Sequence, residues 1–458
     1  EDKLITSPIT VVKVDQETGK QIQAAGVEFR LLDSRKKPIE MEVYYPEHMK
    51  TSIFKTDKKG QFTFPQKLKK GQYYLEEVKA PEGYLKGELL PFEVKEGATW
   101  AEAQVIRYSN RSAKGKIVLQ KIDQKTKETL SGAVFEIFAA EDIVTADQTV
   151  HAEKGELVDT VEVSEKGGCS QNLYLGKYVV KEKKQPEGYV RLKKEYEVEL
   201  KYKDQVTEIV TEELTVANVP VTTELVKTDK KSGKPLEGVS FSVWKKEDEK
   251  LPKFEKKMYV TNQDGKILLE YLKTGTYCIQ EKKTLPGYLL SEQITEFTVD
   301  EEGYSEGKQR LCLKLENEHT NIEVEKLDAD TKKPVEGAVL QIEDLQGKVI
   351  VEKWKTEKEP KQIEKLPEGE YVLVEAEAPF GYQKAEKMKF RVEPRKEVQK
   401  ITLYNRKSEK EKLPEESTGR KDTPKTGDTA TVAKLIAALL GASLLLGLIY
   451  YRKRDRER

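Results

Sequence analysis

The sequence contains few of the residues from which active sites, metal sites and disulfide frameworks are usually built. Its 458 residues include three cysteines and three histidines. Three cysteines cannot form a disulfide framework, and His48, His151 and His319 are too scattered to form a metal-ligand pattern. Because no Ser/His/Asp, Cys/His or metal constellation is present, the sequence predicts no enzyme active site, no metal site and no cofactor.

The chain also lacks an excess of charge of either sign. Lysine plus arginine and aspartate plus glutamate number 81 each, so the formal net charge is zero. Without a basic excess, nucleic acid is not a predicted partner. The length predicts several domains. The chain begins at Glu1 without a methionine or signal peptide, and we interpret it as a mature form or a fragment whose targeting segment has been removed.

One stretch of the sequence occurs four times, with substitutions between the copies. Its copies read YYLEEVKAPEGY (73–84), YVVKEKKQPEGY (178–189), YCIQEKKTLPGY (277–288) and YVLVEAEAPFGY (371–382). In each copy a tyrosine, an apolar residue and a glutamate alternate along a predicted strand and share one face. The glutamates are Glu77, Glu182, Glu281 and Glu375. If that face lines a core, each carboxylate needs a partner there, because an unpaired buried charge is expensive.

Polar partners occur at both ends of each repeat, again on apolar strand faces. The first strands read ITVVKVD (9–15), IVLQKID (117–123), TELVKTD (223–229) and IEVEKLD (322–328), and contain Lys13, Lys121, Lys227 and Lys326. The last strands read AQVIRYSN (103–110), EELTVAN (212–218), RLCLKLEN (310–317) and QKITLYN (399–405), and end at Asn110, Asn218, Asn317 and Asn405. Each repeat therefore places lysine, glutamate and asparagine, in that order, on core-facing positions. By the same counting, Cys278 and Cys312 should lie on outer faces.

The spacing of the repeats indicates whole domains. The four lysines are 108, 106 and 99 residues apart, which is too long for a solenoid repeat. Short strands with turn signals, and no helical stripe before the C-terminus, predict an all-β fold of four tandem antiparallel β-sandwiches. The predicted sandwiches occupy residues 1–111, 112–220, 221–319 and 320–407, and short linkers join them near residues 111–115, 219–222 and 318–321.

After the fourth repeat the composition changes. Residues 408–422 are charged and rich in turn formers, which predicts a disordered linker. Residues 435–451 are all apolar, small or tyrosine, and with Val432 and Ala433 they predict a transmembrane helix at 432–451. The basic tail RKRDRER would then lie in the cytoplasm.

A lysine, a glutamate and an asparagine in one apolar interior can react with each other. Desolvation lowers the pKa of a lysine and raises the pKa of a glutamate, so the lysine can present a neutral, nucleophilic amine. A protonated glutamate can polarise the asparagine carboxamide and pass protons to departing ammonia. The product is a Lys–Asn isopeptide bond, which removes both buried charges.

The four repeats resemble collagen-adhesin (Cna) B-type domains, which are prealbumin-like sandwiches of the SpaA type in Gram-positive surface proteins and pilins. The glutamate stretch is similar to the pilin E-box, YxLxExxAPxGY, which residues 73–84 and 371–382 match well. Residues 178–189 carry Gln185 where the family favours alanine. Residues 277–288 have one residue more before the proline and lack the residue between proline and glycine, so the third repeat departs furthest.

The resemblance implies an autocatalytic intramolecular isopeptide bond between the first and last strands, with the glutamate as the catalytic residue. Carried over, the triads are Lys13–Glu77–Asn110, Lys121–Glu182–Asn218, Lys227–Glu281–Asn317 and Lys326–Glu375–Asn405. The alternative is that these are ordinary polar residues of a sandwich, with lysines that extend along apolar strands to reach water.

Residues 423–428, TPKTGD, precede the apolar segment and resemble the sortase sorting signal LPxTG. Thr423 replaces the leucine, while the core of the motif, Pro424, Lys425, Thr426 and Gly427, is intact. LPEESTG (413–419) contains a leucine but has two extra residues before Thr-Gly, so we favour 424–427. The alternative is a plain single-pass membrane anchor.

The resemblance implies a secreted stalk or adhesin that is anchored in the cell wall of a Gram-positive bacterium, with a precursor held in the plasma membrane. Sortase and peptidoglycan are then its partners, and host extracellular matrix and other pilus subunits are further candidates. The alternatives are a minor or basal subunit of a sortase-assembled pilus and the stalk of a larger surface enzyme. Backbone pilins usually carry a YPK-type lysine, whereas residues 43–47 read VYYPE. Glu47 in that place argues against a polymerising backbone.

The sorting motif predicts how the protein is attached. We expect cleavage between Thr426 and Gly427 and covalent linkage of Thr426 to peptidoglycan. Mass spectrometry of wall fragments should then find a C-terminal peptide that ends at Thr426 and carries a peptidoglycan remnant. Release of the intact protein by detergent alone, without an enzyme that digests the wall, would contradict the prediction.

Overall fold

The structure is a computed structural model that describes residues 6–44, 47–250 and 255–408. The regular elements in these ranges are β-strands, apart from one 3-10 helix, η1 (Lys246–Lys250). Among these described residues, no helix has the length and apolar character that a membrane span requires. The predicted sorting motif and transmembrane helix (432–451), and the linker from residue 409 onward, lie outside the described residues.

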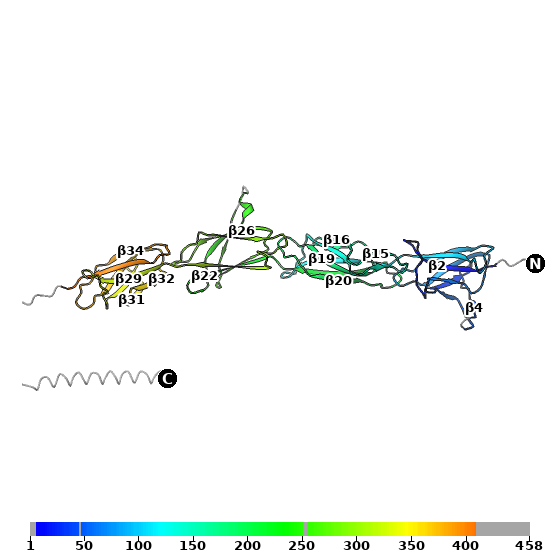
Figure 1. The fold of residues 1–458 in the computed structure, drawn as a ribbon, viewed down its shortest axis with the longest axis horizontal. Coiled ribbons are helices and arrows are strands. Elements are labelled where there is room, and N and C mark those ends of the chain that lie inside the picture. The colour runs from blue at the N-terminus through cyan, green and yellow to red at the C-terminus, as the bar shows by residue number, and fades with distance from the viewer. Residues whose placement is uncertain (1–5, 45–46, 251–254, 409–458) are drawn as a thin grey trace, which may run out of the picture. The chain divides into compact units, whose positions relative to one another are not determined.

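Each repeat forms two sheets (Figure 1). One sheet contains the first and last strands of the repeat, and the other contains the strand that carries the glutamate. In the first sandwich these sheets have the orders β11–β2–β7 and β10–β9–β3–β6. Their strands are β2 (Ile9–Asp15), β3 (Glu28–Leu32), β6 (Ile53–Lys55), β7 (Gln61–Thr63), β9 (Gly71–Lys79), β10 (Leu90–Val94) and β11 (Gln104–Asn110). Two short pairs accompany them, β1 (Thr6–Ser7) with β8 (Leu68–Lys69) and β4 (Met41–Val43) with β5 (Met49–Thr51).

The second sandwich has the same plan. Its first strand pairs with the last strand and with two short strands, and its second sheet has the order β16–β13–β19–β20. The strands are β12 (Lys114–Asp123), β13 (Ala133–Ala139), β16 (Leu157–Val163), β17 (Gly168–Cys169), β18 (Leu173–Tyr174), β19 (Gly176–Lys184), β20 (Glu195–Leu200) and β21 (Ile209–Asn218). A hairpin of β14 (Ile143–Val144) and β15 (Val150–Ala152) is additional.

The third and fourth sandwiches follow the plan of the first. In the third, the sheets have the orders β25–β22–β28 and β24–β23–β26–β27; in the fourth, they have the orders β32–β29–β35 and β31–β30–β33–β34. The third contains β22 (Thr222–Asp229), β23 (Ser240–Lys245), β24 (Lys257–Val260), β25 (Lys266–Glu270), β26 (Gly275–Lys283), β27 (Ile294–Val299) and β28 (Arg310–Asn317). The fourth contains β29 (Asn321–Asp328), β30 (Val339–Glu343), β31 (Val349–Lys355), β32 (Lys361–Glu364), β33 (Gly369–Glu377), β34 (Met388–Val392) and β35 (Gln399–Asn405).

The expectation of purely antiparallel sandwiches is wrong in one respect. The first and last strands of every sandwich pair in parallel, as β2 with β11, β12 with β21, β22 with β28 and β29 with β35. The other strand pairs in the described ranges are antiparallel. Parallel pairing takes the chain into each sandwich at one end of the sheet and out at the other, which an antiparallel pair cannot do.

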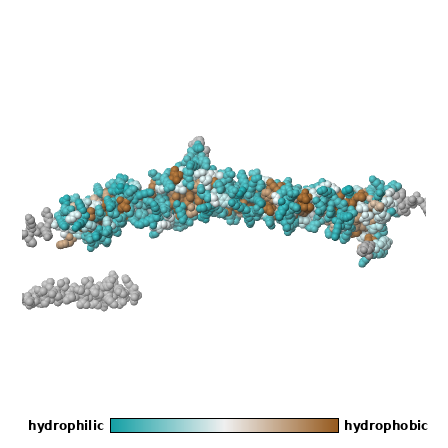
Figure 2. Space-filling model, in the orientation of Figure 1, coloured by the Kyte–Doolittle hydropathy of each residue, from teal (hydrophilic) through white to brown (hydrophobic). Residues whose placement is uncertain are grey.

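Four hydrophobic cores lie between the sheets. In the first, Ile9 and Val11 of β2 pack with Phe29 of β3 and Leu75 of β9, so alternate residues of both sheets supply the core. The other three cores are built mainly from their own sheets in the same way. The outer surface in Figure 2 is mainly hydrophilic, with scattered apolar residues. This arrangement explains why a charged content of 35 % is compatible with folding.

Cys278 and Cys312 alternate out of phase with the core residues of their strands, as the prediction of outer faces requires, but only one of them is exposed. Cys312 is exposed, but Cys278 is buried. Cys278 does alternate out of phase with the core residue Ile279. It is opposite Trp244 in the neighbouring strand, whose indole donates a hydrogen bond to Glu249 of η1. A surface element therefore covers this part of the outer face, which strand alternation alone does not predict.

The turn between β6 and β7, which lies beside Lys13, requires a glycine at position 60. Gly60 has φ of +76° and accepts a hydrogen bond from the backbone N–H of Lys13 through its carbonyl at 2.9 Å. A Cβ at this position would lie 1.7 Å from the carbonyl oxygen of Ile22. Gly19 also has a positive φ, +69°, but a Cβ added there would meet no atom within 4 Å. A side chain at position 19 would therefore introduce backbone strain alone, whereas a side chain at position 60 would introduce both backbone strain and a steric clash.

We predict that Gly60→Ala destabilises the first sandwich far more than Gly19→Ala. The control should cost only the strain of a left-handed alanine, about 1–2 kcal/mol, whereas Gly60→Ala adds a backbone clash that forces the turn to move. Hydrogen exchange of first-sandwich amides in the full chain measures the difference. Equal protection in the two variants would contradict the prediction.

Candidate functional site

The structure brings each predicted lysine, glutamate and asparagine together inside its own sandwich. The parallel register places Asn110 opposite Asp15, two residues beyond Lys13, so the lysine and the asparagine are diagonal neighbours on one face. The same register recurs in the other three sandwiches. Lys13 and Glu77 are fully buried and Asn110 is 1 % exposed. All twelve predicted triad residues are buried.

Each lysine forms a buried ion pair with the glutamate of the facing sheet. The distances from Nζ to the nearer carboxylate oxygen are 2.9 Å for Lys13–Glu77, 3.0 Å for Lys121–Glu182, 3.0 Å for Lys227–Glu281 and 3.5 Å for Lys326–Glu375. The fourth pair is thus looser than the other three. Because a buried charge without a partner is strongly destabilising, this pairing makes the lysine and the glutamate dependent on each other.

Each asparagine donates its side-chain N–H to the same glutamate. The Nδ2–Oε distances are 2.6 Å for Asn110, 3.0 Å for Asn218, 2.6 Å for Asn317 and 3.1 Å for Asn405. In the first sandwich Oε1 of Glu77 contacts Lys13 while Oε2 contacts Asn110. One carboxylate therefore touches both the amine and the amide nitrogen. In the second sandwich, Lys121 Nζ also donates to Oδ1 of Asn218.

Backbone N–H groups hold the glutamate in place. The N–H ten residues after the glutamate donates to its carboxylate in three sandwiches, from Gly87 at 2.7 Å, Leu192 at 2.6 Å and Ala385 at 2.5 Å. Within the described part of the third sandwich, Glu281 Oε2 has no hydrogen-bond partner and lies 3.0 Å from the Lys227 ammonium. Asn317 there donates to Thr284 Oγ1 at 2.8 Å. The E-box that departs furthest in sequence thus also holds its carboxylate differently.

Burial changes the protonation of the lysines. Desolvation lowers the pKa of Lys13 to about 8, against the opposing attraction of Glu77. It lowers the pKa of Lys326 to about 8 as well, opposed by Glu375. The pKa values of Lys121 and Lys227 are lowered for the same reason. A lowered pKa increases the share of neutral amine, which is the nucleophilic form.

Aromatic side chains, which were not among the predicted site residues, line three of the four sites. Phe29 stands opposite Glu77 in the sheet, and its ring centroid is 5.4 Å from Lys13 Nζ. Phe135 and Phe241 take the same place in the second and third sandwiches, whereas Leu340 does so in the fourth. The available sequence signal for these aromatic residues was the repeated glycine followed by an apolar strand, as in GVEF and GAVF.

A buried aspartate two residues after each lysine was also missed. Asp15, Asp123, Asp229 and Asp328 are buried, and each accepts hydrogen bonds from two backbone N–H groups of the turn that follows. In the second and third sandwiches, the last tyrosine of the E-box donates to this aspartate, Tyr189 to Asp123 and Tyr288 to Asp229, both at 2.8 Å. The recurring Lys-x-Asp pattern (KVD, KID, KTD, KLD) was the available signal.

Pro424, Lys425, Thr426 and Gly427 lie outside the described residues, as do Tyr45 and Pro46. In the described ranges, no group of three or more His, Cys, Asp or Glu residues is arranged to hold a metal ion.

Comparison with known proteins identifies the repeats. The family model described as "SpaA: Prealbumin-like fold domain" matches residues 7–106, 115–215, 221–309 and 320–407. No curated protein matches the chain.

Several solved structures are similar at low identity. The Bacillus anthracis TIE protein is 20 % identical over 89 % of this chain and 76 % of its own, with a TM-score of 0.39. The major pilin subunit of Bacillus cereus is 16 % identical over 68 % of this chain and 99 % of its own, with a TM-score of 0.32. A streptococcal ancillary pilin is 18 % identical over 65 % of this chain and all of its own, with a TM-score of 0.29. At these values the likenesses carry no argument about function.

The lowered pKa of Lys13 predicts a pH dependence for a variant that cannot cross-link. In Asn110→Ala, folded Lys13 should titrate near pH 8, and unfolded Lys13 near its ordinary value of 10.5. Between these values the unfolded chain holds more protons, so stability should rise as the pH rises through this window. Pulse proteolysis in urea, read from first-sandwich peptides, measures the trend. The double variant Lys13→Met/Asn110→Ala is the control and should lose it; the same slope in both would contradict the prediction.

Proposed function

The chain belongs to the family of SpaA-type prealbumin-like fold domains, of which it carries four in tandem, and from this we propose that it is a surface stalk locked by intramolecular Lys–Asn isopeptide bonds. The observation that carries the proposal is the glutamate carboxylate that contacts the lysine amine and the asparagine amide nitrogen in all four sandwiches. In this arrangement the lysine amine is the nucleophile, the asparagine amide nitrogen is the leaving group, and the glutamate between them carries the proton.

The first sandwich illustrates the chemistry. Neutral Lys13 Nζ attacks Cγ of Asn110, and a new C–N bond forms. Glu77 takes the proton released by the attacking nitrogen and delivers it to Nδ2, which leaves as ammonia. Its two oxygens lie 2.9 Å from Nζ and 2.6 Å from Nδ2, so neither proton transfer needs a large movement. The product is a neutral amide, which removes the buried ammonium.

The position of the bond suits a stalk. It would join the parallel first and last strands of a sandwich, through which the chain enters and leaves. A pulling force would then pass through the covalent bridge and spare the rest of the domain. In the chain-entropy treatment of cross-links, closing a loop of about 100 residues contributes roughly 4–5 kcal/mol of stability.

The same proposal covers location and partners. The Pro424–Gly427 motif supports attachment to peptidoglycan by a sortase. The segment at 432–451 would anchor the precursor in the plasma membrane. A minor or basal pilus subunit is the alternative role. Glu47, in the place where a YPK-type motif has its lysine, favours the stalk over a polymerising backbone.

Mass spectrometry tests the cross-links. Each bond expels one ammonia, so each should lower the intact mass by about 17 Da. We expect a loss in the first, second and fourth sandwiches, and the third sandwich, whose E-box departs furthest in sequence, decides between three losses and four. Glu77→Ala should abolish the loss in the first sandwich, because the proton carrier is gone, and should make that sandwich sensitive to protease.

The neighbouring Glu76→Ala is the matched control. Glu76 lies one residue away on the opposite face and pairs with Arg30 at 3.1 Å, so its removal should leave the mass deficit intact. Lys13→Met should abolish the bond with a milder loss of stability than Glu77→Ala, because the remaining Glu77 carboxylate still accepts hydrogen bonds from Gly87 N–H and Asn110 Nδ2. An intact mass equal to that of the uncondensed sequence, or an unchanged deficit in Glu77→Ala, would refute the proposed mechanism.

A further inference from the structure

The third sandwich holds its asparagine in a different way from the first and the second. In all three, the asparagine Nδ2 donates one hydrogen bond to the glutamate. In the first sandwich Nδ2 of Asn110 also donates to a backbone carbonyl, that of Leu85, at 2.6 Å, and the second sandwich has the equivalent bond at 3.1 Å. In the third, Nδ2 of Asn317 donates instead to the side chain of Thr284, with 2.8 Å between Nδ2 and Oγ1. A side chain there makes the contact that the backbone makes elsewhere.

The loop that follows the E-box differs in the same place. In the first sandwich this loop reaches the cluster twice, through the carbonyl of Leu85 and the N–H of Gly87. Ser291 has the place of Gly87 in the third, and in the part of that sandwich that the structure describes its N–H forms no hydrogen bond with Glu281. Ser291 instead lines a cavity of about 430 Å³. The loop therefore contributes less to this cluster, and the asparagine takes an acceptor from another part of the chain.

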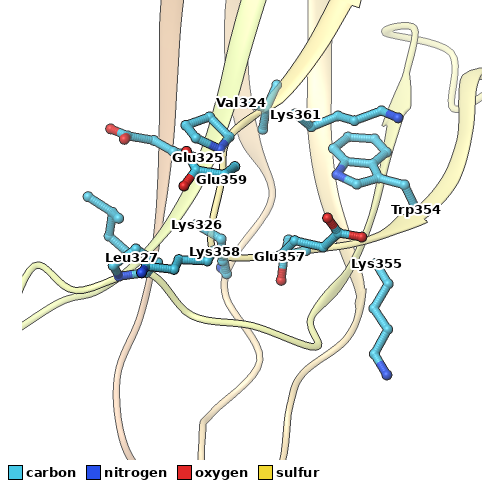
Figure 3. A pocket seen from close by; sticks show the side chains of 13 residues that line it. Val324, Glu325, Lys326, Leu327, Trp354, Lys355, Glu357, Lys358, Glu359 and Lys361 are labelled. Atoms are coloured by element: carbon cyan, nitrogen blue, oxygen red, sulfur yellow. The ribbon is translucent and has the colours of Figure 1, made fainter.

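A cavity by itself does not change the contacts of the glutamate. The fourth sandwich has a cavity of about 520 Å³, lined by residues 324–327, 334 and 354–361 (Figure 3). In Figure 3 the side chains of Trp354 and Lys361 stand on one side of it. In that sandwich Ala385, which also lies ten residues after the glutamate, still donates its N–H to Glu375 at 2.5 Å. The arrangement in the third sandwich thus follows from its loop after the E-box.

The strand that carries the glutamate also positions Thr284. Thr284 follows directly on the last residue of β26, and Glu281 of this strand is in register with Phe241 of β23. A β-branched side chain has few χ1 rotamers, so the hydroxyl is held in a narrow range of directions. The residues at the same place in the other three sandwiches have no hydroxyl; they are Ala80, Gln185 and Ala378.

We propose that Thr284 is a further catalytic residue, which orients the leaving nitrogen of Asn317 and thereby lets the third sandwich form its Lys227–Asn317 bond. The inference rests on the proposed function. An amide nitrogen has two N–H groups, and Glu281 Oε1 and Thr284 Oγ1 accept one bond each. Two acceptors fix the plane of the amide, so that its carbon faces the amine, and such orientation is a large part of the rate of a reaction between held groups.

The bond changes are those of the other sandwiches. Lys227 Nζ attacks Cγ of Asn317, and a C–N bond forms while the Cγ–Nδ2 bond breaks. Glu281 takes the proton released by Nζ and delivers it to Nδ2, which leaves as ammonia. Thr284 accepts a hydrogen bond from Nδ2 and neither gains nor loses a proton. The whole chain should therefore lose ammonia in all four sandwiches.

Two full-length variants test the role of the hydroxyl. Thr284→Val removes it and keeps the shape of the side chain, whereas Thr284→Ser keeps it. Pulse-labelled cell-free synthesis followed by peptide mass mapping gives the half-time of the Lys227–Asn317 cross-link. We expect the valine variant to lengthen it at least about tenfold and the serine variant to stay within about twofold of wild type. The other three sandwiches of the same molecule are the internal control and should be unchanged. A wild-type half-time in Thr284→Val would overturn the proposal.

A second comparison separates orientation of the leaving group from stability of the fold. In Asn317→Ala the hydroxyl has no leaving nitrogen to orient. Adding Thr284→Val to this variant should therefore leave the hydrogen-exchange protection of the third sandwich unchanged. Lower protection in the double variant would show that the hydroxyl stabilises the fold, and the assignment of Thr284 as a catalytic residue would be wrong.

The wild-type chain distinguishes failure of this inference from failure of the proposed function. If none of the four sandwiches loses ammonia, the proposed function fails, and the role of Thr284 fails with it. If the first, second and fourth sandwiches lose ammonia and the third does not, the proposed function stands and the role of Thr284 fails alone.

Discussion

The structure depends on the removal of a lysine ammonium and a glutamate carboxylate from water into the middle of an apolar sandwich. Neither charge is tolerable alone, because the free-energy cost of desolvating a single buried ion exceeds the stabilisation that its packing provides. The two must therefore arrive on facing sheets at the same depth. A register slip of one residue in either strand would turn its charge outward and leave the other unpaired. The pair thus specifies which strands face each other and in which register.

The asparagine extends this constraint to the last strand. Its amide has to reach the carboxylate, and the parallel register in all four sandwiches sets the asparagine two residues past the lysine level. The turn aspartate, which stands opposite the asparagine, is satisfied by backbone N–H groups and does not compete for the lysine. The first strand, the glutamate strand and the last strand are thereby linked through one polar cluster, although they are far apart in sequence.

The residues of this cluster could be predicted because strand alternation is a local property. Lys13, Glu77 and Asn110 each stand out as a polar residue on an apolar face, and the order recurs in four repeats. Parallel pairing of the first and last strands could not be predicted in this way, because the partners are nearly a whole domain apart. The burial of Cys278 depends on η1, which is a tertiary contact without a local sequence pattern.

The four clusters form a natural series in which the reacting groups stay the same and their surroundings change. The lysine is walled by Phe29 and Tyr108 in the first sandwich, and by one phenylalanine in the second and third. In the fourth, Leu340 and Leu403 take those places, and the ion pair lengthens to 3.5 Å. An aromatic wall excludes water and holds the amine against its partner, which strengthens their interaction in a medium of low dielectric constant. The packing around the triad, more than the triad itself, therefore sets how tightly each cluster is held.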